Sequence, residues 1–205
     1  MKRLQAACSL IEKCEIFADI GCDHGFVAQY VLQNDLAQKV FACDISAPSL
    51  NKARLLLGDD ERVEFFVSDG FSAFSSAPSQ AAILGMGGDE IIKIISGNKC
   101  ADKLILQPQN HAYELRKHLF ESGFIIKSDF CVFDRGRYYD IIGAEKGNGE
   151  TPRIEKLFYG IFCDEKNPLL REKLEKEEKK ILGYKQTEEN KRKLSIIREV
   201  LKWQR

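Results

Sequence analysis

The sequence contains no long hydrophobic run. None of its apolar stretches is longer than eight residues, whereas a helix needs about 20 apolar residues to cross a bilayer. The first residues also lack the continuous apolar segment of an export signal, because polar Gln5 interrupts them. We therefore expect no membrane partner. We interpret segment 1–8 as a first helix, and its apolar face comprises Leu4, Ala7, Leu10 and Ile11.

A net charge of either sign is also missing. Lysine plus arginine and aspartate plus glutamate each total 31, so the formal net charge is zero. Nucleic-acid-binding domains usually carry an excess of basic residues. Any RNA site on this protein must therefore be a local basic patch, and DNA is not expected as a partner.

The cysteines follow neither a metal-binding nor a disulfide pattern. Their number, seven, is odd, and no two of them are spaced like a pair of metal ligands. Disulfides are rare in reducing compartments, where thiols stay free. We therefore expect no metal site, free thiols and a cytoplasmic location.

What remains is the pattern of a globular α/β protein. A chain of 205 residues, 44% of them hydrophobic, can bury the core of one domain and a small appendage. Between residues 15 and 145, short β-branched or aromatic runs alternate with helical stretches, which is typical of βαβ units around a mostly parallel sheet. The predicted strands are 16–20, 40–44, 63–68, 81–84, 103–107, 125–133 and 139–145.

The last two predicted strands distinguish between related types of α/β sheet. Only the segment Asp134-Arg135-Gly136-Arg137 separates the last two strands, which predicts a tight antiparallel hairpin. Five βα units that end in such a hairpin are typical of the class I methyltransferase sheet, and plain dinucleotide-binding sheets lack it. We therefore predict an α/β fold with a Rossmann-like, seven-stranded class I methyltransferase sheet over residues 1–148, although a fold alone does not establish chemistry.

Residues 149–205 predict a helical C-terminal extension. A turn-rich linker at 147–152 precedes a strongly charged tail. Apolar residues recur there at helical spacing, with a break near Gly183 and a cap at Thr187. The apolar positions are Leu170, Leu174, Ile181, Leu194, Ile197 and Leu201. The pattern predicts an antiparallel helical hairpin that is too short for an independent coiled coil.

A glycine-containing loop between the first strand and its helix is the first candidate binding site. Open α/β sheets bind cofactors at this place. Asp19, Gly21 and Gly25 match an acidic-x-Gly-x-Gly-x-Gly loop, but Asp23 replaces the middle glycine. A carboxylate there repels a pyrophosphate and attracts the sulfonium and amino group of S-adenosylmethionine. A structural turn without a cofactor is the alternative.

Two further carboxylates follow the next two strands. Asp44 stands where an acidic side chain accepts hydrogen bonds from ribose hydroxyls, and a helix N-cap is its alternative role. Asp69 can accept from an adenine amino group, although a plain Asp-Gly turn explains it equally well. The predicted cofactor-binding residues are Asp19, Gly21, Cys22, Gly25, Asp44, Ile45, Ser68, Asp69, Gly70 and Gly85.

Several motifs together resemble one known family. They are 18–24 (Ala-Asp-Ile-Gly-Cys-Asp-His), 85–88 (Gly-Met-Gly-Gly), 104–108 (Leu-Ile-Leu-Gln-Pro) and 115–116 (Leu-Arg). With the helical C-terminus, the chain resembles the bacterial tRNA (adenine-22-N1)-methyltransferases over almost its whole length. The resemblance implies S-adenosylmethionine as cofactor, tRNA as partner, and transfer of a methyl group to N1 of adenine 22. Members often have Ser at position 22 and Ala-Tyr at 25–26, so Phe26 retains only the stacking face of that tyrosine.

The catalytic candidates lie inside the glycine loop. Asp23 can stabilise the positive charge that passes to the base and then accept a proton, and His24 can relay that proton. The alternatives are a carboxylate that only holds the cofactor's amino group or caps the helix, and a histidine fixed by backbone hydrogen bonds. N1 lies on the Watson–Crick edge, so the target base must be exposed or flipped before reaction.

Small, amide, aromatic and basic residues are the substrate candidates. The predicted substrate-binding residues are Phe26, Met86, Gly87, Gly88, Gln107, Pro108, Asn110, Arg116, Arg135 and Arg137. Tyr138 and Tyr139 are further stacking candidates. Further RNA-backbone candidates are Lys117, His118, Lys176, Lys179, Lys180, Lys191 and Lys193. A solvated helix face crossed by ion pairs is the alternative for the tail lysines.

Three other functions fit parts of this pattern. One is a class I methyltransferase for a small molecule or protein, whose tail serves dimerisation. Another is a noncatalytic RNA-binding protein with a vestigial cofactor fold. A nicotinamide dehydrogenase is the third, and Asp23 and the terminal hairpin argue against it. The sequence leaves the oligomeric state open between a monomer and a weak dimer.

Overall fold

The protein is described by a computed structural model over residues 2–205, so Met1 of the expected first helix lies outside the described residues. A seven-stranded sheet has the order β3-β2-β1-β4-β5-β7-β6. The strands are β1 Cys14–Ile20, β2 Ala37–Asp44, β3 Val63–Val67, β4 Gln80–Met86, β5 Lys103–Pro108, β6 Phe124–Asp134 and β7 Arg137–Lys146. All pairings are parallel except those of β7, which runs antiparallel to both β5 and β6. The predicted Rossmann-like methyltransferase sheet is confirmed.

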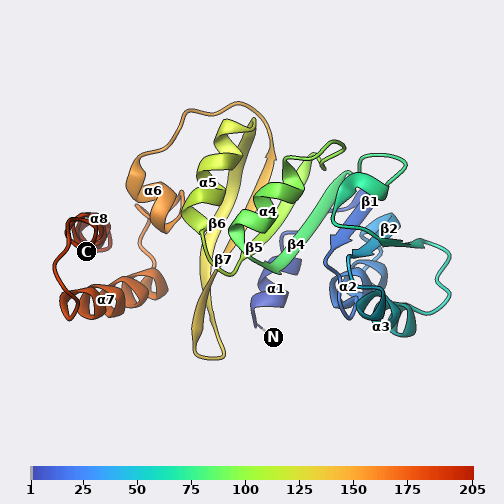
Figure 1. The fold of residues 1–205 in the computed structure, drawn as a ribbon, viewed down its shortest axis with the longest axis horizontal. Coiled ribbons are helices and arrows are strands. Elements are labelled where there is room, and N and C mark those ends of the chain that lie inside the picture. The colour runs from blue at the N-terminus through green and yellow to red at the C-terminus, as the bar shows by residue number, and fades with distance from the viewer. Residues whose placement is uncertain (1) are drawn as a thin grey trace.

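Helices cover both faces of the sheet (Figure 1). They are α1 Lys2–Cys8, α2 Phe26–Gln33, α3 Ala47–Leu57, α4 Gly88–Ile95 and α5 Ala112–Glu121, with a short 3-10 turn η1 Phe71–Ala73. One core lies between the sheet and α4 and α5, around Ile91 and Leu115. A second core lies under α1 and α2, around Phe17 and Val31. The central strands are therefore buried on both sides, which explains why they appear in the sequence as continuous apolar runs.

The β6–β7 hairpin is longer than predicted and projects past its neighbour. Its turn consists of Arg135 and Gly136, both with positive φ (48° and 81°), as a two-residue hairpin turn requires. The pairing of β7 with β5 ends at Leu106↔Ile142, whereas its pairing with β6 continues to Asp134↔Arg137. Because β6 runs in the same direction as β5, the tip lies beyond the carboxyl edge of the sheet, and it projects clearly in Figure 1.

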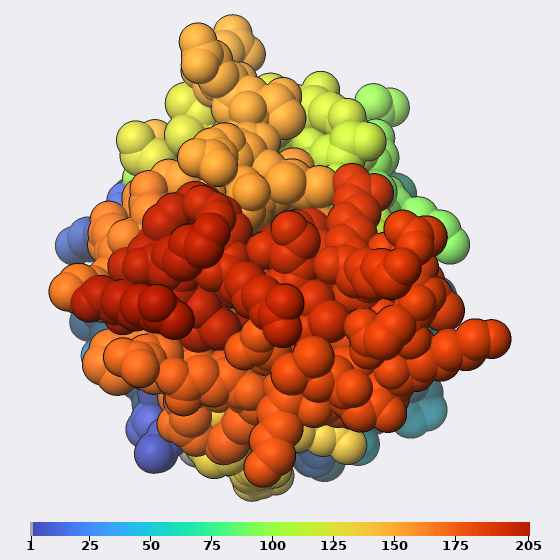
Figure 2. Space-filling model, turned by 90° about the vertical axis from the view of Figure 1, so that its left-hand side faces the viewer, coloured from blue at the N-terminus to red at the C-terminus, as the bar shows by residue number. Residues whose placement is uncertain are grey.

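The C-terminal extension forms three helices: α6 Ile154–Tyr159, α7 Pro168–Leu182 and α8 Glu188–Trp203. The predicted helical hairpin is confirmed in α7 and α8, which share one apolar cluster around Leu174 and Ile197. Gly183 ends α7, and the Thr187 side chain caps α8. The extension covers one end of the molecule (Figure 2). Among residues 2–205, no helix has both the length and the apolar character needed to span a membrane.

Arg116 is a correction to the sequence prediction, because it holds this extension and does not bind substrate. Its side chain is 1% exposed, and its Nε lies 2.7 Å from Oδ2 of Asp129. Its Nη2 lies 3.3 Å from Oδ2 of Asp140, and that carboxylate also pairs with Lys173 of α7 at 2.8 Å. The guanidinium further donates to the Leu157 carbonyl of α6 at 3.2 Å. A buried charge must be paired, so this guanidinium has no free donor for RNA.

Candidate functional site

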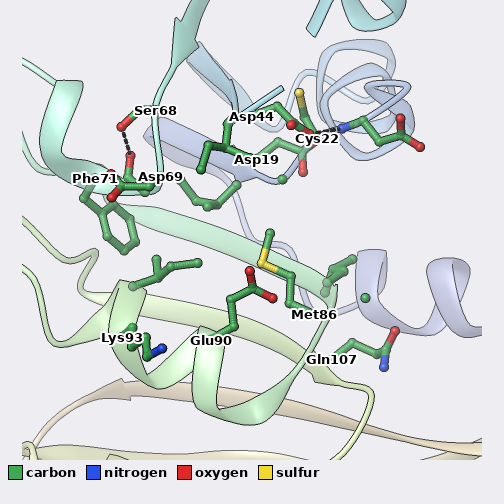
Figure 3. A pocket seen from close by; sticks show the side chains of 18 of the residues that line it. Asp19, Cys22, Asp44, Ser68, Asp69, Phe71, Met86, Glu90, Lys93 and Gln107 are labelled. Carbon is green, nitrogen blue, oxygen red and sulfur yellow. Dashed lines mark hydrogen bonds between the residues drawn. The ribbon is translucent and has the colours of Figure 1, made fainter. Parts of the chain in front are cut away.

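One large cavity lies at the carboxyl edge of the sheet. Its volume is about 1280 Å³, and the ends of β1 to β5 line it together with α1 and α4. The predicted site residues that line it are Asp19, Gly21, Cys22, Asp23, His24, Phe26, Asp44, Ile45, Ser68, Asp69, Gly70, Gly85, Met86, Gly87, Gln107 and Asn110. Figure 3 shows Asp19, Asp44 and Asp69 on one side of this space. Met86, Glu90 and Gln107 lie on the other side.

The loop after β1 closes tightly at the bottom of the cavity. Gly21 has φ +69°, and a Cβ added there would lie 2.0 Å from Cε of Met86. The backbone N–H groups of Gly21 and Cys22 both donate to the Cys43 carbonyl of β2, at 2.8 and 2.9 Å. Only glycine fits both this backbone conformation and this contact. The loop therefore stays close to the strands and leaves room for a ligand above it.

Asp19 is a buried carboxylate directed into the cavity from β1. It is 4% exposed, and its Oδ2 accepts from the backbone N–H of Ala28 at 3.1 Å in the first turn of α2. Burial raises the pKa of Asp19 to about 7, against the opposing effect of the Ala28 hydrogen bond, and the nearby Asp44 raises it further. A positively charged ligand in the cavity would favour the ionised form of this carboxyl group, so the site suits a cation.

Asp44 connects the end of β2 to two backbone segments. Its Oδ2 accepts from the N–H of Asp23 at 3.1 Å, and its Oδ1 accepts from the N–H of Ser46 at 2.8 Å. The N-cap of α3 is Ser46, whose hydroxyl accepts from Ser49. The alternative of Asp44 as that N-cap is therefore wrong. The carboxylate still lines the cavity and retains lone pairs for ribose hydroxyls.

Asp69 is the most accessible of the three carboxylates. It lies in the turn after β3, where its Oδ1 accepts from the hydroxyl of Ser72 at 3.2 Å. The adjacent Gly70 has φ +147° and approaches Ile94 of α4. Ser68, Asp69 and Gly70 thus form one rim of the cavity, as the sequence predicted from their position at a strand end.

Comparison with known proteins identifies the family to which this chain belongs. A family described as "Methyltransferase domain" matches residues 1–142. A Mycoplasma pneumoniae protein provisionally named a tRNA methyltransferase is 32% identical over 78% of this chain and 78% of its own length. The tRNA (adenine(22)-N(1))-methyltransferase of Bacillus subtilis is 28% identical over 73% of this chain and 66% of its own. The chain belongs to the methyltransferase family that contains these tRNA enzymes.

A solved structure agrees over nearly the full length. It is a Streptococcus pneumoniae protein, described as a candidate tRNA (m1A22) methyltransferase, in complex with S-adenosyl-L-methionine. The identity is 26%, the TM-score is 0.88, and the match covers 98% of this chain and 99% of that one. The C-terminal helices are therefore part of the shared architecture of this methyltransferase family.

The rim beside the glycine loop of this methyltransferase carries a charged and an aromatic pair. Oδ1 of Asp23 lies 3.1 Å from Nζ of Lys52, and Oδ2 lies 3.7 Å from Nε2 of His24. The rings of His24 and Phe26 stack with centroids 5.4 Å apart and an interplanar angle of 16°. Both rings line the cavity, so they offer a flat surface on which a base can stack.

Besides Arg116 and the two hairpin arginines, three predicted site residues do not line the cavity. Gly25 is the N-cap of α2, and its missing side chain lets α3 approach, because a Cβ there would lie 3.0 Å from that of Ala53. A Cβ on Gly88 would lie 2.6 Å from the His111 carbonyl, so this glycine allows α4 to approach the loop before α5. Pro108 is buried in the pairing of β5 with β4. For the two glycines, the close approach of neighbouring elements explains the residue type.

Arg135 and Arg137 lie outside the cavity, on the hairpin tip, where both are exposed. The basic residues of the extension are mostly paired with neighbouring acids. Lys176 pairs with Glu172, Lys191 with Glu188 at 2.7 Å, and Lys193 with Glu177 at 2.6 Å. Lys117 of α5 pairs with Glu121 at 3.6 Å. These contacts favour the solvated, ion-paired helix face over a free basic stripe for those lysines.

Sequence reasoning missed several residues of the cavity. They include Arg3, Leu4, Asp89, Glu90, Lys93 and Ile94. Glu90 and Lys93 lie in α4, which begins at the last residue of the predicted 85–88 motif, so the helix that follows a strand end was a usable signal. Arg3 had no such signal, because α1 reaches the cavity by packing against β5, β6 and β7, which lie far from it in the sequence.

Proposed function

We propose that this protein transfers the methyl group of S-adenosylmethionine to N1 of an adenine in tRNA, at position 22. The observation that carries the proposal is the meeting of Asp19, Asp44 and Asp69 in one cavity of a chain that belongs to this methyltransferase family. A cationic nucleoside donor suits this acidic half of the site, whereas an anionic dinucleotide does not.

The residues of the acidic half fit S-adenosylmethionine. Asp44 offers acceptors for the ribose hydroxyls, and the accessible Asp69 offers one for the adenine amino group. Gly21 and Gly85 bring backbone without side chains to the cavity, so a ligand can approach closely. Buried Asp19 faces the same space and balances positive charge. When bound, the cofactor supplies an electrophilic methyl group on a sulfonium.

The residues at the ends of β4 and β5 are proposed to receive the adenine. Gly85 and Gly87 leave an open floor, and the half-buried Met86 lies between them. Asn110 and Gln107 supply amide groups at the same edge. The His24–Phe26 pair is proposed to stack on the flipped base, with N1 directed at the methyl group. Alignment of this kind accounts for much of the rate of a methyl transfer.

Asp23 and His24 are the proposed catalytic residues. The N1 lone pair forms the new bond to the methyl carbon, the carbon–sulfur bond breaks, and its electrons stay on sulfur, so the base becomes cationic. Lys52 already pairs with one oxygen of Asp23, which reduces the electrostatic effect of this carboxylate on the base. The second oxygen, Oδ2, lies 3.7 Å from Nε2 of His24, and its proposed role is to accept a proton from the cationic adenine, with His24 as the relay to solvent.

The tRNA backbone is proposed to cross the projecting hairpin. Arg135 and Arg137 are exposed at its tip, and the rings of Phe133 and Tyr138 are in contact there, with centroids 4.9 Å apart and planes tilted by 51°. We propose that residues 1–148 form the methyltransferase domain and 149–205 the extension that borders this RNA surface. Because the proposed substrate is tRNA, we also propose that the protein is located in the cytoplasm.

The decisive experiment is methylation of tRNA in solution. An unmodified tRNA transcript with A22 is incubated with the protein and S-adenosylmethionine, and its nucleosides are then analysed for N1-methyladenosine. A matched transcript with G22 is the control for position. We expect methylation of the first transcript and none of the second. Absence of N1-methyladenosine in both would favour a small-molecule or protein substrate, and absence of cofactor binding by calorimetry would favour the noncatalytic alternative.

A further inference from the structure

Arg3 occupies a defined place at the mouth of the cavity. Its guanidinium carbon lies 4.9 Å from the centroid of the Tyr139 ring. Its Nη1 lies 3.5 Å from Oε1 of Gln107, and its backbone N–H donates to Oδ2 of Asp134 at 3.4 Å. The side chain is thus held against β5 and β7 while it lines the cavity.

This position separates Arg3 from the acidic half of the site. In the sheet order β3-β2-β1-β4-β5-β7-β6, the three site carboxylates lie at the carboxyl ends of β1 and β2 and in the turn after β3, whereas Gln107 and Tyr139 belong to β5 and β7. Strand β4 lies between the two groups. The Arg3 guanidinium therefore lies in the half of the cavity opposite the three aspartates, a half that also contains the Glu90 carboxylate.

The charge of Arg3 is not neutralised within the described chain. Among residues 2–205, no carboxylate forms an ion pair with its guanidinium, and its contacts are with a ring and an amide oxygen. Stacking on Tyr139 fixes the planar group and leaves most of its N–H donors without a protein acceptor. A cation that is oriented in advance loses little conformational entropy on binding an anion.

We propose that Arg3 binds a phosphate of the tRNA backbone next to the target adenine. The inference rests on the proposed function, because only a nucleic acid brings phosphates to this half of the cavity. A nucleotide whose base enters the pocket leaves its flanking phosphates at the mouth, where Arg3 lies. The fork of an arginine matches two phosphate oxygens. Arg3 is a substrate-binding residue in this proposal, and it takes no part in cofactor binding.

The test compares Arg3→Ala and Arg3→Lys with Lys2→Ala. Lys2 is an exposed residue of the same helix that does not line the cavity, so its replacement removes the same charge one position away. Dissociation constants for the tRNA transcript are measured at several salt concentrations, and those for S-adenosylmethionine are measured by calorimetry. We expect Arg3→Ala to weaken tRNA binding about tenfold at low salt and to reduce the salt slope by about 0.7–0.9.

The other variants separate charge from geometry. Arg3→Lys retains the charge but not the fork, so its tRNA affinity should lie between those of the unaltered protein and Arg3→Ala. Lys2→Ala should change the slope far less than Arg3→Ala, and all three variants should bind S-adenosylmethionine like the unaltered protein. Thermal unfolding of each variant verifies that α1 remains folded. If Arg3→Ala unfolds, Arg3→Lys tests the fork by itself, and a tRNA affinity equal to that of the unaltered protein would then overturn the phosphate contact.

The possible failures are distinct. An unaltered protein that binds no tRNA overturns the proposed function, and this inference with it. An unaltered protein that binds tRNA, together with an Arg3→Ala variant of unchanged slope, overturns the phosphate contact alone. A loss of S-adenosylmethionine affinity in Arg3→Ala would assign the guanidinium to the cofactor and also overturn it.

Discussion

Oδ2 of Asp44 accepts a hydrogen bond from the backbone N–H of Asp23 at 3.1 Å. The bond joins the end of β2 to the loop after β1, 21 residues earlier in the chain. It also holds Asp23 in a left-handed conformation, φ 42°, which is unfavourable for a residue with a side chain. One carboxylate therefore both shapes the glycine loop and lines the cavity.

Replacement of Asp44 should weaken cofactor binding more than any surface acid does. Asp44→Ala removes the loop hydrogen bond and the acceptors for ribose, and hydrogen bonds to a charged group contribute about 1.5–3 kcal/mol. We expect at least about a tenfold loss of S-adenosylmethionine affinity by calorimetry. Asp59→Ala, in the exposed turn after α3, is the control and should bind normally. Equal affinities for the two variants would contradict this role.

The pKa of Asp19 predicts a pH-dependent affinity. Burial raises this pKa to about 7, so the carboxyl group of the free protein gains its charge as the pH rises through neutrality. A cationic ligand prefers the charged form, so S-adenosylmethionine should bind more tightly at pH 8 than at pH 6. In Asp19→Asn the affinity should be lower, and most of this pH dependence should disappear. His24→Gln is the control for the histidine of the same cavity.

The same shift has a consequence for stability. The folded protein holds the Asp19 proton up to about pH 7, whereas the unfolded chain releases it near pH 4. The free energy of unfolding should therefore fall, through this group, as the pH rises from about 4 to about 7. In Asp19→Asn, the decrease in the free energy of unfolding that Asp19 causes between about pH 4 and about pH 7 should be absent. Denaturant titrations at pH 5 and pH 8 measure it, and identical pH dependence in both proteins would contradict the shift.

The position of Gly21 against Met86 predicts a steric conflict when a side chain is added to the glycine loop. A Cβ at Gly21 would lie 2.0 Å from Cε of Met86, so Gly21→Ala should push the methionine into the cavity and weaken S-adenosylmethionine binding. Met86→Ala in the same protein should restore part of the affinity. Gly58→Ala is the control, because Gly58 also has positive φ but no atom within 4 Å. It should lower stability without changing cofactor affinity. Failure of Met86→Ala to compensate would rule out this steric cause.

Arg116 should contribute strongly to the stability of the folded protein. Arg116→Ala leaves the carboxylates of Asp129 and Asp140 buried without their guanidinium, which costs about 3–5 kcal/mol in comparable cases. Arg171→Ala, in an exposed pair with Glu175, should cost below about 1 kcal/mol. Denaturant unfolding measures both changes. A stable Arg116→Ala protein with reduced tRNA affinity would restore the sequence-based prediction of a substrate contact.

The hairpin tip should affect tRNA binding alone. Replacement of both Arg135 and Arg137 by alanine should lower tRNA affinity and reduce the salt slope by up to about 0.9 for each phosphate that the variant no longer binds. The matched control replaces Lys127 and Lys146 by alanine, because these lysines lie at the opposite end of the same two strands. Cofactor affinity should stay constant in both proteins. Equal tRNA affinity of the two double variants would argue against a role of the hairpin in RNA binding.

Residues at the carboxyl ends of parallel strands were predictable from the sequence. Asp19, Asp44 and Asp69 were assigned to one site because parallel strands bring their carboxyl ends to one edge, and all three line the cavity. Arg116 was misassigned because its helix position is visible in the sequence, whereas its burial depends on acids of β6 and β7. Arg3 was missed because no sequence motif surrounds it. Its helix α1 reaches the cavity only in the folded structure.

Local pattern by itself determined the order of strands and helices, the hairpin finish, the glycine loop and the helical tail. These features depend on backbone propensity and hydrophobic period, which act between residues near in the chain. Tertiary structure decided which polar groups are buried and which face the cavity. Burial and charge pairing depend on elements that are far apart in the chain, and the contact of Arg3 with Gln107 spans 104 positions.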